Sequence, residues 1–262
     1  MRTKLLVLAA SMFLVTPAAS AAKPHRIDRC EKDWNKVRRI HSVTNKLTYW
    51  RSVSAHCTGD GEYYSRLANL YMLKKNYPQA QKVLDMALAT HLSHRNEVLN
   101  TLGELAWAQH HVHRARAIFL KVTREYPQWY GGYQALGALD MSLHRYRNAI
   151  FYLNAANHQK PHGLAYGFLA EAYHNLGMDG KAIAAMGRAY VLTPSIATQP
   201  NIVLAVAGSF ARLGRYRHAR RLLQILKTKN PEAESNPRYA KLMALVNQHL
   251  KPATKAGGIA VH

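Results

Sequence analysis

The chain has 262 residues, of which 36 are Lys or Arg and 14 are Asp or Glu, so its formal net charge is +22. A charge this large favours anionic partners and opposes self-association, but it does not determine the fold. The scattered carboxylates, together with the absence of G-x-S-x-G, H-E-x-x-H and glycine-rich phosphate motifs, indicate a protein that is not an enzyme and that needs no cofactor.

Residues 1–22 predict a secretory signal peptide. Arg2 and Lys4 precede an apolar run over residues 5–15, and small residues follow Pro17. The run is shorter than the ~20 residues that span a bilayer, which favours cleavage over an uncleaved anchor. We expect cleavage near Ala21 or Ala22, a location in the periplasm or outside the cell, and no transmembrane segment in the mature chain.

Residues 23–60 form a predicted N-terminal helical segment that contains Cys30 and Cys57, the chain's two cysteines. In an exported chain, two cysteines most simply form a disulfide. No C-x-x-C motif is present, which excludes thioredoxin-like redox chemistry and a cysteine-based zinc site.

A disulfide would constrain this segment. A straight helix over residues 31–54 would separate its ends by ~36 Å, whereas bridged cysteines need Cα atoms within ~4.4–6.8 Å. If the bond forms, the segment must reverse, and residues 41–45 offer Ser, Thr and Asn to cap helix ends. If the thiols are free, one long helix is the better interpretation.

Residues 61–233 repeat with a period near 34 residues. The first column is Ala80, Ala115, Ala149, Ala182 and Ala219. A small residue stands twelve places earlier in each unit: Ala68, Gly103, Gly137, Ala170 and Ala207. A proline stands twelve places after the last four alanines: Pro127, Pro161, Pro194 and Pro231.

These columns predict pairs of helices. Small residues allow two helices to approach where they cross, and a large apolar residue four places after each alanine lies on the same helical face. Proline cannot continue a helix interior, so it ends each unit. Pairs are expected over residues 61–94, 96–129, 130–163, 163–196 and 200–233, with an insertion at 195–199. A capping helix over 234–250 and a disordered tail over 251–262 would follow.

The turn between the helices of a pair reads LGRYRHA in the last unit and LKKNYPQA in the first. With the alanine that follows it, this pattern resembles the tetratricopeptide repeat, and the resemblance covers residues 61–233. It implies an all-α fold, a right-handed α-solenoid of about five helix pairs with a C-terminal capping helix. It also implies a protein-binding function.

In that family the first helix of each pair lines a concave groove. The resemblance therefore implies a partner-binding groove formed by Asn69, Asn100, Glu104, Trp107, Gln134, Glu171, His174 and Asn175, together with Glu97 and Met141. The set is rich in amides and slightly acidic. Amide side chains can donate to and accept from the backbone of an extended segment. Trp107 is either an anchor for the partner or an ordinary packing residue between repeats.

Basic residues concentrate on the predicted second helices instead, at Lys82, Arg114, Arg116, Lys121, Arg124, Arg188, Arg220 and Arg221. This distribution supports an alternative function. The chain would bind a polyanion through its outer face: an acidic polysaccharide, lipopolysaccharide or an anionic membrane surface. Nucleic acid is not expected as a partner of an exported protein.

Two further patterns concern metal and carboxylate binding. His110, His111 and His113 could bind a metal, but Lys and Arg occupy the same turn in other units, so a basic turn is preferred and no metal site is assigned. The chaperone-binding variant of the family grips a carboxylate with Lys, Arg and Asn. Asn69 fits that clamp, but Ser65, Gly131 and Ala135 stand at its basic positions.

The sequence thus predicts a scaffold that binds a segment of another protein, in envelope assembly, a secretion system or pilus assembly. Gly131 and Gly132 are expected to relieve crowding after Trp129.

Overall fold

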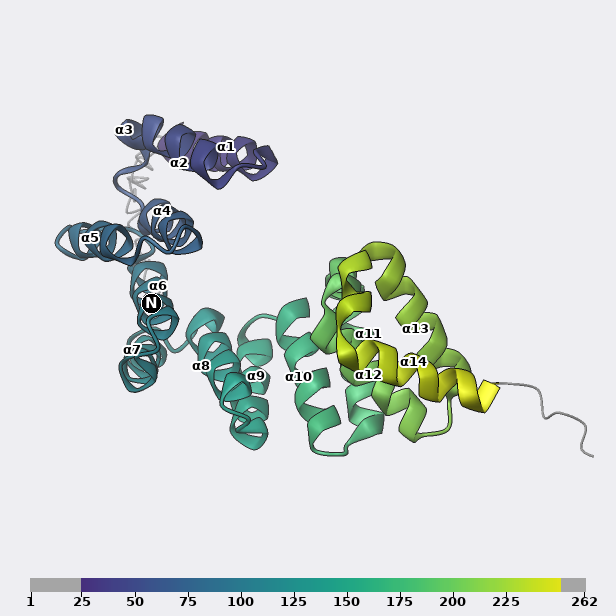
Figure 1. Cartoon of the computed structure of the whole chain (residues 1–262). Coiled ribbons are helices and arrows are strands. Elements are labelled where there is room, and N and C mark those ends of the chain that lie inside the picture. Colours follow the sequence, from purple (N-terminus) through teal and green to yellow (C-terminus); the bar gives the residue numbers. More distant parts are fainter. Residues whose placement is uncertain (1–24, 251–262) are drawn as a thin grey trace, which may run out of the picture.

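The computed structural model describes residues 25–250, so the predicted signal peptide and the tail over 251–262 lie outside the described residues. Within 25–250 the secondary structure is helical, with one isolated bridge between Asp60 and Ser93 and no strand. The helix pairs follow one another in chain order along an arc (Figure 1). None of the helices in this range has the length and hydropathy needed to cross a membrane.

The N-terminal segment is a helical hairpin closed by a disulfide. Helix α1 (His25–Arg39) and helix α2 (Val43–Ser52) reverse at residues 40–42, and the Ser42 side chain caps α2. Short helix α3 (Ser54–Cys57) then brings Cys57 to Cys30, with their Cα atoms 5.5 Å apart. The predicted disulfide is therefore present, and the alternative of one long helix is wrong.

Trp50 joins this hairpin to the repeats. Its side chain is fully buried, and its indole Nε1 donates to the carbonyl of Tyr63 at 3.2 Å. The ring of Trp34 meets that of Trp50 edge-on, with their centroids 5.2 Å apart. The hairpin therefore covers the apolar end of the first pair, as a solenoid requires.

Five helix pairs and a final helix follow. The pairs are α4 (Gly61–Leu73) with α5 (Tyr77–Leu88), α6 (Arg95–Ala108) with α7 (Val112–Glu125), α8 (Tyr130–Ser142) with α9 (Tyr146–Gln159), α10 (Gly163–Asn175) with α11 (Asp179–Leu192), and α12 (Pro200–Arg212) with α13 (Tyr216–Lys229). Two 3-10 helices, η1 (Pro194–Thr198) and η2 (Pro231–Ser235), begin at column prolines, and α14 (Pro237–Leu250) closes the array. The predicted all-α solenoid with about five pairs and a capping helix is confirmed.

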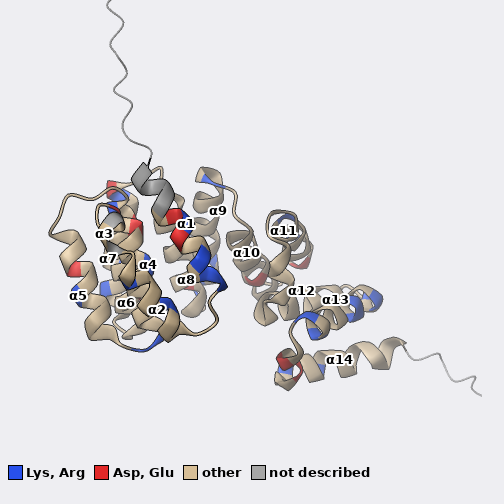
Figure 2. Cartoon of the chain, turned by 90° about the horizontal axis from the view of Figure 1, so that it is seen from above, with Lys and Arg blue, Asp and Glu red and all other residues tan. Residues whose placement is uncertain are grey.

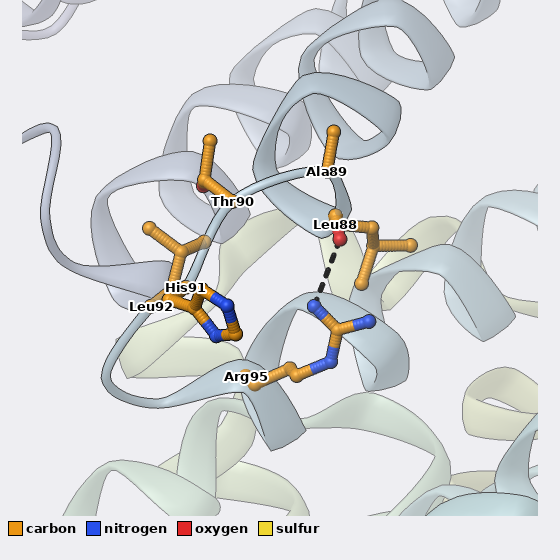
Figure 3. Close-up of a pocket in the computed structure, with 6 residues that line it drawn as sticks. All are labelled: Leu88, Ala89, Thr90, His91, Leu92 and Arg95. Atoms are coloured by element: carbon orange, nitrogen blue, oxygen red, sulfur yellow. Dashed lines mark hydrogen bonds between the residues drawn. The ribbon is translucent and has the colours of Figure 1, made fainter.

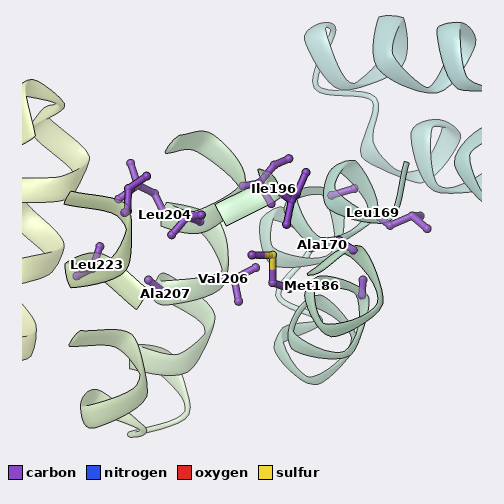
Figure 4. Packing of buried hydrophobic residues seen from close by; sticks show 14 of the residues in the cluster. Leu169, Ala170, Met186, Ile196, Leu204, Val206, Ala207 and Leu223 are labelled. Carbon is purple, nitrogen blue, oxygen red and sulfur yellow. The ribbon is translucent and has the colours of Figure 1, made fainter. Parts of the chain in front are cut away.

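The small-residue column lies where the helices of a pair cross. A Cβ atom added to Gly103 would come within 2.4 Å of the Phe119 ring, and one added to Gly137 would come within 2.6 Å of Leu153. The five column alanines are all fully buried. Figure 4 shows the same packing further along the chain, where Ala170, Met186 and Val206 meet.

The turn within each pair has one residue in the left-handed conformation. These residues are Lys75, His110, His144, Gly177 and Gly214, with φ between 55° and 72°. Glycine adopts this conformation without strain, whereas Lys and His do so at a cost. The first three pairs therefore hold a mildly strained turn that the last two avoid.

The first helices of successive pairs contact each other along the array: α4 with α6, α6 with α8, α8 with α10 and α10 with α12. Each second helix instead packs on its own partner and on the next first helix. Close packing along one side makes that side the shorter, concave one. The first helices therefore line the inner face, as the resemblance implied.

Candidate binding groove

A pocket of about 370 Å³ opens on this inner face, between α6, α8 and α10. Its lining comprises Glu97, Asn100, Glu104, Trp107, Trp129, Tyr130, Gly131, Gln134, Ala135, Ala138, Leu164 and Phe168. Four of the eight groove residues predicted from the sequence thus meet in one place: Asn100, Glu104, Trp107 and Gln134. Glu97, also predicted to lie in the groove, joins them.

Helix α6 supplies the polar side of the pocket. Glu97, Asn100, Glu104 and Trp107 follow one another at helical spacings of three and four, which places them on one face. The Asn100 Nδ2 donates to Glu104 Oε1 at 2.8 Å. This donation fixes the orientation of the amide and leaves its Oδ1 as a buried oxygen with no hydrogen-bond partner among the described residues.

Burial and a neighbouring carboxylate dominate the electrostatics. Burial, and then the negative charge of Glu97, raise the pKa of Glu104 to about 7, although the Asn100 hydrogen bond opposes the shift. Burial also raises the pKa of Glu97, and Glu62 raises it further. Both side chains are partly buried and neither forms an ion pair among the described residues, which is unfavourable for a charged group.

Aromatic rings form the opposite wall. Trp129 ends the connection before α8, and Gly131 lies in the first turn of that helix. A Cβ atom at Gly131 would come within 2.2 Å of the Trp129 ring, so this glycine makes room for the indole, as predicted, whereas a Cβ atom at Gly132 would meet Val122 of α7. The Tyr130 ring stacks on the His162 ring at a centroid distance of 5.9 Å.

Trp107 packs between repeats and also lines the pocket, where its role as an anchor for a partner stays a prediction. Its partly buried ring packs against the cluster that contains Ala106, Phe119 and Leu136.

The other predicted groove residues lie outside this pocket. His174 contacts α12, where its Nδ1 lies 2.9 Å from Ser209 Oγ and 2.7 Å from Arg212 Nη2. Burial and the charge of Arg212 lower the pKa of His174 to about 4, so the ring is neutral at pH 7 and works as a link between repeats. Glu171 is partly buried, and the Asn175 amide donates to the Glu171 carbonyl at 2.8 Å. Asn69 is partly buried on α4, and Met141 belongs to the core.

The pocket also contains residues that the sequence did not single out: Trp129, Tyr130, Leu164 and Phe168. Tyr130, Leu164 and Phe168 lie on first helices, and Leu164 and Phe168 are four residues apart. Extending the groove face of α6 to the next two first helices could have found these three. Trp129 precedes its helix, so only the neighbouring glycines pointed to it.

A second cavity, of about 470 Å³, lies at the connection between α5 and α6 (Figure 3). The Arg95 Nη1 donates there to the carbonyl of Leu88 at 2.9 Å, which satisfies the end of α5. This interaction closes a loop, and we assign no ligand to the cavity. An apolar cavity of about 430 Å³ between α11, α12 and α13 includes Arg221 and His218 in its lining.

Among the described residues, one group of potential metal ligands lies close enough to share an ion: Asp60, Glu62 and His94. Other interactions already occupy it. Asp60 and His94 are paired at 2.8 Å, and Glu62 is paired with Arg66. The pair ties the start of α4 to the start of α6. His110 and His111 lie in the turn before α7 and His113 lies in the first turn of that helix. All three are exposed, and none is part of the group.

No protein-family model and no curated protein matches the sequence. Solved structures match its fold. Yeast Tom70 superimposes with a TM-score of 0.66 at 14% identity over 86% of this chain, and Cut9 from the APC/C hetero-tetramer Cut9–Hcn1 with 0.63 at 16% over 80%. The matched regions are 47% of the Tom70 chain and 40% of the Cut9 chain, so this chain spans less than half of either.

Two shorter structures match over nearly their whole length. PilF from Pseudomonas aeruginosa gives a TM-score of 0.61 at 16% identity over 84% of this chain and 96% of its own. A tetratricopeptide repeat protein from Thermus thermophilus gives 0.56 at 21% over 70% of this chain and 99% of its own. Identities this low establish the shared architecture alone. The chain described here has the fold of the tetratricopeptide repeat proteins.

Proposed function

We propose that this chain is a scaffold that binds a segment of another protein in its concave groove, centred on the pocket between α6, α8 and α10. The observation that carries the proposal is the pocket itself, where buried hydrogen-bonding groups of α6 face the aromatic side chains around the start of α8. Aromatic anchors with precisely placed polar groups are typical of binding sites.

The pocket is suited to an extended segment. Successive first helices present their side chains at regular intervals along the inner face, and an extended chain presents its own side chains at regular intervals. The indole of Trp107 and the rings of Trp129 and Phe168 would cover apolar side chains of the partner. The fold likeness to protein scaffolds is consistent with this function and does not identify the partner.

We further propose that the protein acts in the periplasm or outside the cell, in envelope, secretion or pilus assembly. The support is the signal-like sequence at residues 1–22 and the disulfide between Cys30 and Cys57. Structural disulfides persist in oxidising compartments.

A pull-down from the envelope extract of the source organism tests the groove. Trp107→Ala combined with Asn100→Ala should remove the retained partner while leaving the helical circular dichroism signal intact. The matched control is Arg220→Glu combined with Arg221→Glu on the exposed face of α13, which should retain the partner. The opposite result would overturn groove binding.

One observation favours the polyanion alternative. Helix α13 carries Arg217, Arg220, Arg221, Lys227 and Lys229 and no acidic residue. These side chains are exposed, and blue ribbon runs along this helix in Figure 2. If the charge reversal on α13 abolished binding and the groove variant did not, binding of an anionic envelope polymer or lipid would replace the groove proposal.

A further inference from the structure

The buried polar side-chain atoms of the groove pocket that have no partner among the described residues are acceptors. Asn100 is 8% exposed, and its Oδ1 is buried without a hydrogen-bond partner among the described residues. The same holds for the Oε1 of Gln134 on the facing helix. Beside them stand the carboxylates of Glu97 and Glu104. A ligand that satisfies this set must bring several hydrogen-bond donors.

The pocket also lacks positive charge. The chain has 36 basic residues against 14 acidic ones, yet neither Glu97 nor Glu104 forms an ion pair among the described residues. The groups whose charges act on the two carboxylates are Glu62, Asp60, His94 and Arg66. Arg66 is engaged with Glu31 and Glu62 and lies over the Trp34 ring, and His94 is engaged with Asp60.

One lysine, Lys160, lies against the aromatic wall, and it forms no ion pair with either carboxylate among the described residues. The Lys160 Nζ lies 5.2 Å from the centroid of the Tyr130 ring, and its side chain is exposed. From α10 the pocket receives only the apolar side chains of Leu164 and Phe168. Two partly buried carboxylates thus share the pocket, and the cations whose charges act on Glu97, His94 and Arg66, are paired with other carboxylates.

We propose that this pocket receives an arginine side chain from the partner segment, an inference that rests on the proposed function of the groove. A guanidinium offers five N–H donors in one plane and a charge that cannot be lost, which matches two carboxylates and two amide oxygens. It is more weakly hydrated than an ammonium group and stacks on aromatic rings, so the indoles of Trp107 and Trp129 favour Arg over Lys.

Short peptide mixtures test the proposal on the full-length protein. Four mixtures of acetylated, amidated peptides differ only in the central residue, which is Arg, Lys, citrulline or Glu, and the flanking positions are random. Citrulline keeps the shape of arginine and removes its charge. We expect the arginine mixture to be retained at least about tenfold over the citrulline mixture, as charge-assisted hydrogen bonds to buried carboxylates require, with lysine between them.

Glu97→Gln combined with Glu104→Gln should abolish this preference because it keeps the shape of the pocket and removes its charge. The control is Glu125→Gln combined with Glu232→Gln, two exposed carboxylates outside the pocket, which should keep the preference. The thermal melting curves of both variants report whether each is folded.

The outcomes separate the two proposals. Equal retention of the arginine and citrulline mixtures, lost together in the Trp107→Ala/Asn100→Ala protein, would overturn the arginine pocket and leave groove binding standing. If the Trp107→Ala/Asn100→Ala protein retained the peptides as fully as wild type, both the arginine pocket and groove binding would be overturned. Dimerisation of the protein alone, abolished by the Glu97→Gln/Glu104→Gln change, would make a second copy the occupant and overturn the partner segment.

Discussion

Glu104 carries a conflict between stability and binding. The carboxylate is buried beside Glu97, and its pKa is raised to about 7 from an ordinary value of 4.5. The folded state therefore binds a proton more tightly than the unfolded state. Between pH 4.5 and about 7 the free energy of unfolding falls as the pH rises, and above about 7 the full penalty of the buried charge is present.

Replacing Glu104 with Gln should therefore stabilise the protein at pH 8. One pKa unit corresponds to ~1.4 kcal/mol, and after allowance for solvent relaxation we expect a gain of about 1–2 kcal/mol in the free energy of unfolding. The gain should shrink as the pH falls below about 7 and disappear below pH 4.5, where the wild-type side chain becomes protonated in both states. Chemical denaturation of both proteins across this pH range measures it. A Gln variant less stable than wild type at pH 8 would contradict the burial argument.

At the residue scale, the tetratricopeptide resemblance pointed to the first helices as the lining of the groove. On those helices, helical spacing then led to Asn100, Glu104, Trp107 and Gln134, because a face defined by steps of three and four is a property of the sequence. It could not separate pocket residues from residues that join neighbouring repeats. His174 has the spacing of a groove residue, but Ser209 and Arg212 come from the next pair and hold its ring. This contact depends on how neighbouring helix pairs stack, which helical spacing within one helix does not show.

At the scale of the helix pair, Gly103 is matched in size to Phe119, the largest residue at its position, although Gly137 also faces a leucine, Leu153. Gly103 faces Phe119, while Ala68 and Ala170 occur in the units that carry Leu84 and Met186 at the equivalent position. The larger phenyl ring fills the space that a Cβ atom would take. The two positions of a pair should therefore be coupled.

Gly103→Ala should destabilise the protein by about 1–3 kcal/mol, the usual cost of overpacking a core, although alanine is the better helix former. Adding Phe119→Leu should recover part of the loss, since the pair would then match Ala68 with Leu84. Denaturation of the two single variants and the double variant gives the coupling energy. Simple additivity of the two changes would refute a size-matched contact.

The disulfide should stabilise mainly the N-terminal hairpin, α1–α3. The bond closes a loop with a sequence separation of 27 and should contribute about 3 kcal/mol by restricting the unfolded chain. Cys30→Ala combined with Cys57→Ala should increase hydrogen exchange in α1–α3 much more than in α8–α13, because contacts in a solenoid are between neighbours. A uniform increase along the chain would argue against local action.

The helix pairs and their boundaries were the most predictable part of the structure. Three residue classes in register gave the helix pairs, and proline marked their ends. The left-handed conformation within the turns was not predicted from the sequence. Lys75, His110 and His144 adopt it in three pairs, and glycine at these positions would have indicated it. Short loops between well-packed helices impose that conformation regardless of the side chain.

At the scale of the whole molecule, the inner and outer faces of the curved array differ in charge. The first helices are packed together on the inner face and carry amides and carboxylates, while exposed Arg and Lys side chains gather on second helices such as α13 (Figure 2). Arg116 on the second helix α7 is partly buried and has a structural use. Arg116 Nη1 donates to Asp140 Oδ1 at 2.7 Å and so neutralises a carboxylate that is fully buried. A net charge of +22 therefore coexists with an acidic pocket.

This division predicts different salt responses for the two faces. Between ~0.1 M and ~1 M salt the Debye length falls from ~10 Å to ~3 Å, which screens exposed charges and affects buried ones much less. Binding of a groove-dependent partner should weaken only modestly over this range, whereas binding of dextran sulfate, as a polyanion probe, should fall steeply. Arg220→Glu with Arg221→Glu should lower dextran sulfate binding several-fold and leave the groove partner's affinity within about twofold, because long-range attraction between exposed charges is all that the change removes. Titrations at several salt concentrations measure both slopes. If the affinity of the groove partner fell with salt as steeply as that of dextran sulfate, the outer face would be the binding site. The partly buried carboxylates and aromatic contacts of the groove cannot produce such a steep dependence.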